Sequence, residues 1–223
     1  MVRQGEMNGE LVLRLDGARP LSPASVEELS ALCDRAEDDR EAGPVTVHVT
    51  GVPSEGWTTG LTVGLVSKWE RVVRRFERLG RLTVAVASGE CAGTALDLLL
   101  AADLRIVTPG TRLRLAAVGG STWPGMSVYR LTQQAGAAGI RRAVLLGTPI
   151  EVDRALALNL VDEVSEDPAK TLAGLAEAAA ALDGAETAIR RQLIFEDGST
   201  TFEDALGAHL AAADRALRRE ATS

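Results

Sequence analysis

The chain has 223 residues, 24 of them lysine or arginine and 31 aspartate or glutamate, so its formal net charge is −7. This length fits one domain with a full core, and an acidic chain without a basic run argues against nucleic acid or an anionic membrane surface as the main partner. Cys33 and Cys91 show neither metal-ligand spacing nor a disulfide framework. Neither a signal core nor the roughly 20 apolar residues that cross a bilayer are present, so we expect a soluble, cytoplasmic protein.

The first half of the chain alternates short apolar strands with helices. We predict, in order, a strand over 10–16, a helix over 23–39, a strand over 45–50 and a helix over 61–79. Ser22 before Pro23 is typical of a helix start. Trp69 and Phe76 recur at helical spacing with other apolar residues, which indicates an amphipathic helix with these rings in the core. Two such steps favour a right-handed layered α/β fold.

The stretch 81–109 predicts a strand, a glycine-bearing turn, a helix and a second strand. Residues 82–87 are apolar and partly β-branched, as in a strand buried on both faces. A helix is expected to begin near Gly93 and Thr94. Its first N–H groups lack intrahelical partners and carry the positive end of the helix dipole. Small residues at this point would let a substrate oxygen approach those donors.

Asp97 lies in the same first turn and has two interpretations. The spacing Thr94-x-x-Asp97 resembles a capping box, with Asp where Glu or Gln is usual. Alternatively, a carboxyl group beside exposed N–H donors combines a proton carrier with an oxyanion site. The residues alone leave both roles open.

The second half of the chain is expected to be mainly helical. We predict a strand over 111–115, a glycine-rich loop over 116–125, short helices over 126–135, 140–146 and 152–159, an extended segment over 160–164 and a helical tail beyond 168. Trp123 and Tyr129 fit either an aromatic pocket or ordinary packing. Asn159 suits a left-handed position. His209 lies on an apolar stripe of the last helix, and we expect it in the core or at a subunit contact.

Two motifs resemble the crotonase (enoyl-CoA hydratase/isomerase) superfamily. Residues 87–97, ASGECAGTALD, with the following ADLRI of 102–106, match the strand–turn–glycine–helix segment of that family. Residues 146–161, LGTPIEVDRALALNLV, match its downstream signature. The similarity runs from about Leu11 to Val164. Trp123-Pro-Gly and Leu217-Arg-Arg look closest to the small hydratase-like proteins of 3,5-dihydroxyphenylglycine biosynthesis.

The resemblance implies a fold and a set of site residues. The fold is α/β, a crotonase-like ββα spiral with C-terminal helices, with a core over 1–165 and a helical segment over 166–223 in the same structural unit. The implied oxyanion-hole donors are the backbone N–H groups of Thr94 and Thr59, with Thr58 as an alternative, and Asp97 is the implied catalytic residue. A second family carboxylate would fall near Ala117, where no acid is present. The implied substrate-binding residues are Trp57, Thr58, Gly93, Trp123 and Tyr129.

The implied activity is that of an acyl-CoA hydratase or dehydratase. It would stabilise a thioester enolate and remove water from a polyketide-CoA intermediate in 3,5-dihydroxyphenylacetyl-CoA formation. No cofactor or metal is expected, because coenzyme A is part of the substrate. The implied partners are an acyl-CoA thioester, a type III polyketide synthase and further copies of the chain in a homotrimer or homohexamer. The absence of an acid at Ala117 supports an alternative, a non-catalytic acyl-CoA-binding accessory protein of the synthase.

Overall fold

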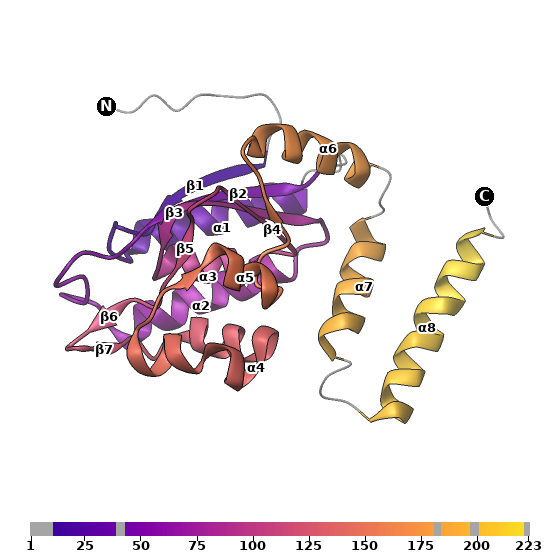
Figure 1. Cartoon of the computed structure of the whole chain (residues 1–223). Coiled ribbons are helices and arrows are strands. Elements are labelled where there is room, and N and C mark those ends of the chain that lie inside the picture. Colours follow the sequence, from indigo (N-terminus) through magenta and orange to yellow (C-terminus); the bar gives the residue numbers. More distant parts are fainter. Residues whose placement is uncertain (1–10, 39–42, 181–183, 197–200, 221–223) are drawn as a thin grey trace.

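The computed structural model describes residues 11–38, 43–180, 184–196 and 201–220, and shows a sheet layered with helices and followed by a helical tail (Figure 1). The first half contains β1 (Val12–Asp16), α1 (Pro23–Asp38), β2 (Val45–Gly51), α2 (Val63–Glu77), β3 (Thr83–Cys91), α3 (Thr94–Ala101) and β4 (Leu104–Val107). The second half contains β5 (Arg112–Leu113), β6 (Ala117–Val118), β7 (Ser121–Thr122), α4 (Met126–Leu146), β8 (Ile150–Glu151), α5 (Val152–Ala157), β9 (Glu163–Val164), α6 (Pro168–Ala180), α7 (Gly184–Glu196) and α8 (Phe202–Glu220). The predicted α/β class is confirmed.

The central sheet is parallel along its main path, in the order β1, β2, β3, β4, β9. Strand β5 pairs in parallel with the end of β3, and β8 pairs antiparallel with β5. Successive side chains of β3 point to opposite faces of the sheet. Ala85 and Ala87 join the main core with α1, α2 and α3, whereas Val84 and Val86 pack against Leu172 of α6. Both faces of β3 are therefore buried, as its apolar sequence predicts.

The predicted helix starts have identifiable caps. Helix α1 begins at Pro23, as predicted, and the Ser22 Oγ accepts the Ser25 N–H at 3.3 Å. Helix α2 begins later than predicted, because the Thr62 Oγ1 accepts the Leu65 N–H at 3.2 Å and ends the preceding loop. Asn159 has a φ of 55°, which confirms the predicted left-handed position.

One segment of the second half follows the prediction and one differs from it. Helix α4 consists of two helical parts that meet at a break at Gly136, where φ is 68° and ψ is 155°, as the predicted helices over 126–135 and 140–146 require. Such a conformation is readily available only to glycine. The predicted loop at 116–125 contains a hairpin of β6 and β7, with Gly119 and Gly120 at its turn. Both glycines have a positive φ, which favours the two-residue turns of hairpins.

Arg191 of α7 connects the C-terminal region to the sheet through an ion pair and hydrogen bonds. Its side chain is 8% exposed and contacts the Asp103 carboxylate with both Nε and Nη2 at 2.6 Å. It also donates to the carbonyl oxygens of Leu79 and Arg81. Asp103 in turn accepts the Thr83 N–H at 2.8 Å. One buried guanidinium thus connects α7 with the segments that flank β3 and α3.

Helix α8 contacts α7, which lies between it and the rest of the chain in Figure 1. Its apolar side chains are exposed: Phe202, Leu206, Leu210 and Leu217. His209 is also exposed, so the expectation that it lies in the core of this chain is wrong. A role of this stripe at a subunit contact stays a prediction. Among the described residues, no helix is both long and apolar enough to cross a membrane.

We predict that Arg191→Met lowers the free energy of unfolding by about 3–5 kcal/mol, because it leaves a largely buried Asp103 carboxylate without its ion-pair partner. Arg190→Met is the matched control, since Arg190 is 64% exposed and lies 3.8 Å from Glu186. The control should change stability by less than about 1 kcal/mol. Urea denaturation followed by circular dichroism measures both. Equal effects of the two substitutions would contradict a special role of Arg191.

Candidate functional site

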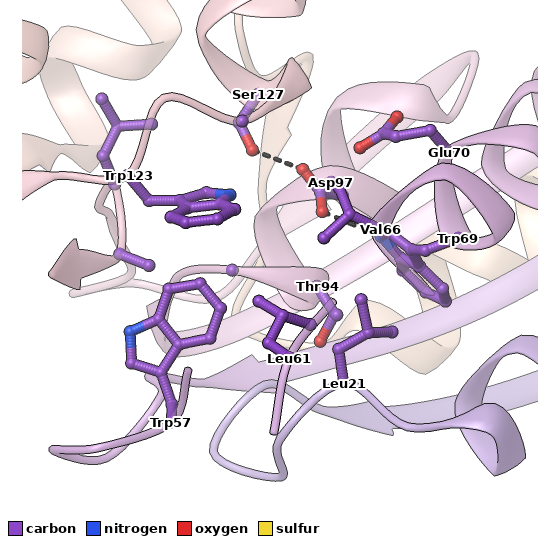
Figure 2. Close-up of a pocket in the computed structure, with 14 residues that line it drawn as sticks. Leu21, Trp57, Leu61, Val66, Trp69, Glu70, Thr94, Asp97, Trp123 and Ser127 are labelled. Carbon is purple, nitrogen blue, oxygen red and sulfur yellow. Dashed lines mark hydrogen bonds between the residues drawn. The ribbon is translucent and has the colours of Figure 1, made fainter. Parts of the chain in front are cut away.

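A pocket lies beside the N-terminus of α3, and Figure 2 shows its lining. Part of the wall is apolar and comes from Leu21, Leu61, Val66 and Leu115. The aromatic and polar part comes from Trp57, Trp69, Trp123, Glu70, Thr94, Asp97 and Ser127. Apolar walls with a few converging polar groups are typical of small-molecule sites.

The start of α3 is open toward this pocket. The N-cap residue is Gly93, with φ 57° and ψ −129°, and no side chain of the described residues caps it. A Cβ at Gly93 would lie 2.8 Å from the Pro53 Cγ, so both the backbone conformation and the space require glycine. Gly93 and Thr94 line the pocket. The unpaired N–H groups of the first turn therefore lie at its wall.

The capping-box interpretation of Asp97 is wrong. Because Gly93 and not Thr94 is the N-cap residue, Asp97 is the fourth helical residue and cannot reach back as a third residue would. Its Oδ2 instead accepts the Trp69 Nε1–H at 2.9 Å, and its Oδ1 accepts the Ser127 hydroxyl (Figure 2). Asp97 is thus held by α2 and α4, on either side of α3.

Burial determines the protonation of Asp97. The residue is 8% exposed, and desolvation raises the pKa of its carboxyl group, while the hydrogen bonds from Ser127 and Trp69 act in the opposite direction. A carboxyl group with a raised pKa can hold or release a proton closer to neutral pH than an ordinary aspartate. The pocket lining therefore includes a buried carboxyl group with a raised pKa.

Glu70 of α2 is a second carboxyl group in the pocket lining. Its Oε2 accepts from Arg130 Nη1 at 3.0 Å. Burial, and after it the negative charge of Asp97, raise the pKa of Glu70 to about 7, although Arg130 lowers it. Glu70 was missed because its partner Arg130 lies 60 residues later in the chain. No local pattern in a single sequence indicates that contact.

Two indole rings meet at the pocket. Trp57 and Trp123 have ring centroids 5.2 Å apart and planes at 78°, an edge-to-face contact. The Trp57 Nε1–H donates to the Ala117 carbonyl oxygen at 2.8 Å, which fixes the ring against β6. The structure thus brings together Trp57, Trp123 and Gly93, three of the residues predicted to bind substrate.

Other predicted site residues lie outside the pocket lining. Tyr129 is 56% exposed, and neither it nor Thr58 or Thr59 belongs to the lining. The Thr59 N–H donates to the Gly56 carbonyl oxygen at 2.9 Å within a turn. It is therefore already engaged, and a second oxyanion donor stays a prediction that falls on Thr58. No group of three metal-ligating side chains occurs in the described part of the chain.

Known proteins similar in sequence to this chain are enoyl-CoA hydratases. No family model matches the chain. Over 217 residues it is 98% identical to an enoyl-CoA-hydratase of Amycolatopsis orientalis, in a match that covers 97% of this chain and 100% of that protein. The chain belongs to the enoyl-CoA hydratase family. A short-chain-enoyl-CoA hydratase of Clostridium acetobutylicum is 22% identical over 177 residues, which are 74% of this chain and 67% of that protein.

Solved structures confirm the crotonase-like fold. An enoyl-CoA hydratase/isomerase family protein of Silicibacter pomeroyi has a TM-score of 0.81 at 21% identity, covering 96% of this chain and 98% of that one. An enoyl-CoA hydratase of Mycobacterium smegmatis has a TM-score of 0.82 at 15% identity, covering 95% and 89% of the two chains. At this identity the likeness establishes the fold alone. In this member of the hydratase family, Ala117 occupies an exposed position in β6 and leaves Asp97 and Glu70 as the carboxyl groups of the pocket.

We predict that the free energy of unfolding falls as the pH rises through the range in which Glu70 ionises. Its pKa of about 7 in the folded protein exceeds the ordinary 4.5, so folding retains a proton between these pH values. The free energy of unfolding should therefore fall through this window, by at most about 3 kcal/mol. Glu70→Gln removes the effect, and its stability relative to wild type should rise from pH 5 to pH 8. Urea denaturation at several pH values measures this, with the exposed Glu27→Gln as control. A pH-independent difference would contradict the raised pKa.

Proposed function

We propose that this protein is an acyl-CoA hydratase or dehydratase that stabilises a thioester enolate. The observation that carries the proposal is the pairing of an open helix start at Gly93 and Thr94 with the buried Asp97 carboxyl group in one pocket. Membership of the enoyl-CoA hydratase family supports an acyl-CoA thioester as substrate. Coenzyme A is then part of the substrate, and no separate cofactor is needed.

In the proposed reaction, the thioester carbonyl oxygen accepts a hydrogen bond from the Thr94 N–H. Removal of the α-proton moves negative charge onto this oxygen, where the helix start stabilises it. A donor of this type contributes about 3–4 kcal/mol to transition-state stabilisation. Asp97 carries the proton, and loss of the β-hydroxyl as water completes the elimination. Thr58 is the proposed second donor.

The finer substrate assignment is a polyketide-CoA intermediate that loses water on the way to 3,5-dihydroxyphenylacetyl-CoA. The sequence resemblance to the 3,5-dihydroxyphenylglycine branch motivates it, and the paired indoles of Trp57 and Trp123 fit a flat or cyclic acyl group. A type III polyketide synthase would supply the intermediate, in the cytoplasm.

The second candidate function is a non-catalytic acyl-CoA-binding protein that supports the synthase. It is favoured by Ala117, where the family's second carboxylate is missing. Purified protein that binds a CoA thioester, turns over none and increases the product of the synthase would support this alternative. Turnover by the isolated protein would exclude it.

We predict that Asp97→Asn lowers kcat by about 10²–10⁴-fold, the usual contribution of a positioned proton carrier. Asparagine keeps the shape of the side chain and can still accept the Trp69 hydrogen bond, so the dissociation constant for a CoA thioester should change only a few-fold. The exposed Asp153→Asn on α5 serves as control. Stopped-flow absorbance of the enoyl thioester measures the rate. Unchanged turnover would remove Asp97 from the mechanism.

We also predict that the chain forms a homotrimer or homohexamer through the apolar stripe of α8. Leu210 is 60% exposed, and a second copy that covers it would gain apolar burial. Leu210→Asp should therefore lower the molar mass measured by light scattering during size-exclusion chromatography. Ala208→Asp, on another face of the same helix, should leave the mass unchanged. A monomeric wild-type protein would contradict this assembly.

A further inference from the structure

An acidic cluster of Glu70, Glu77 and Asp97 lies beside the pocket, and two of its members, Glu70 and Asp97, line it. Arg130 of α4 is 7% exposed and contacts Glu70 at 3.0 Å and Glu77 at 2.6 Å. Arg74 contacts Glu77 at 2.8 Å from a side chain that is 55% exposed. Asp97, the third acid of the cluster, is held by neutral donors. One buried guanidinium therefore faces three carboxyl groups, and close like charges favour retention of a proton.

Glu70 and Asp97 differ in their access to solvent. The Glu70 side chain is 20% exposed, whereas Asp97 is 8% exposed and accepts a hydrogen bond at each carboxyl oxygen. Burial, and after it the negative charge of Asp97, raise the pKa of Glu70 to about 7, although Arg130 lowers it. A solvent-accessible carboxyl group with a pKa near neutrality can donate and regain a proton at physiological pH.

Glu70 also has an oxygen available to a ligand. Its Oε2 accepts from Arg130, whereas its Oε1 accepts no hydrogen bond from any residue that the structure describes. The side chain is 20% exposed and lines the pocket. In Figure 2 its carboxyl group is directed toward Asp97, on the side of the pocket away from Trp57. The arrangement combines a fixed orientation, a free oxygen and contact with solvent.

We propose that Glu70 is a catalytic acid that protonates the leaving hydroxyl group, in place of the carboxylate that is missing at Ala117. This inference rests on the proposed function, and it assigns to α2 a role that the family resemblance does not place there. Arg130 is the positioning residue, because it holds Oε2 at 3.0 Å.

The proposed step balances without a further reactant. The Asp97 carboxylate takes the α-proton, and the electron pair of the broken C–H bond passes into the enolate at the Thr94 N–H. The C=C bond then forms as the enolate collapses and the β C–O bond breaks. Glu70 gives its proton to the departing oxygen, and water leaves. Asp97 ends protonated and Glu70 ionised, and exchange with solvent through the exposed edge of Glu70 restores both.

The test separates removal of the α-proton from loss of the hydroxyl group. Dehydration is measured with 3-hydroxybutyryl-CoA, and α-proton exchange in deuterium oxide is measured by NMR with butyryl-CoA, which has no leaving group. We expect Glu70→Gln to lower dehydration about 100-fold or more, while exchange stays within about threefold of wild type. Asp97→Asn should lower both. The wild-type pH profile of dehydration should fall above about pH 7, and this limb should be absent in Glu70→Gln.

Glu27→Gln is the matched control, because it makes the same substitution at an exposed position on α1. It should keep dehydration within about threefold, and Glu70→Asp should restore part of the rate lost in Glu70→Gln. Dehydration unchanged in Glu70→Gln, or dehydration and exchange lowered equally, would overturn the role of Glu70 alone. Wild-type protein that neither dehydrates nor exchanges would overturn the proposed function, and the role of Glu70 with it.

Discussion

The Asp97 carboxyl group connects three helices that are distant in the sequence. Trp69 of α2 and Ser127 of α4 both donate to it, and α3 carries it into the core. A buried carboxyl group without such donors would be strongly unfavourable, so the spacing of the three helices is coupled to this one side chain. The same contacts form the wall of the pocket. The packing of these helices and the proposed proton transfer consequently depend on a single group.

Helix α3 shows why this arrangement is robust. Every residue from Ala95 to Ala101 is buried, so the helix is fixed by apolar packing on all sides. A helix held in this way can leave its N-terminal N–H groups without a side-chain cap, because packing compensates for the missing hydrogen bond. The acidic cluster beside it has the opposite character. Arg130 is shared by Glu70 and Glu77, so one positive charge faces two carboxyl groups. Clusters of this kind are common at functional sites, where some stability is given up for activity.

Much of the fold could be predicted from the sequence, because it depends on local patterns. The Ser22-Pro23 start, the buried strand before Gly93 and the left-handed Asn159 all follow from preferences of a few neighbouring residues. The β6–β7 hairpin was missed because its strands have two residues each, too few for an alternating pattern.

The site was predictable only in part. Gly93 and Trp123 lie where the motifs predict, but the partners of Asp97 lie 28 and 30 residues away in the sequence. A shift of one residue in the helix start also turned an expected cap into a buried side chain. Glu70 is indistinguishable in the sequence from the charged residues around it on α2. Its environment arises from the tertiary packing of α2, α3 and α4, which no local pattern encodes.

The contact between Trp57 and Trp123 has a consequence for ligand entry. The hydrogen bond from the Trp57 Nε1–H to the Ala117 carbonyl oxygen holds one ring in place, and the edge-to-face contact orients the other. A flat group can pack against these rings as they stand, whereas a bulkier group must displace them and break that hydrogen bond. The tryptophan pair therefore selects ligands by shape.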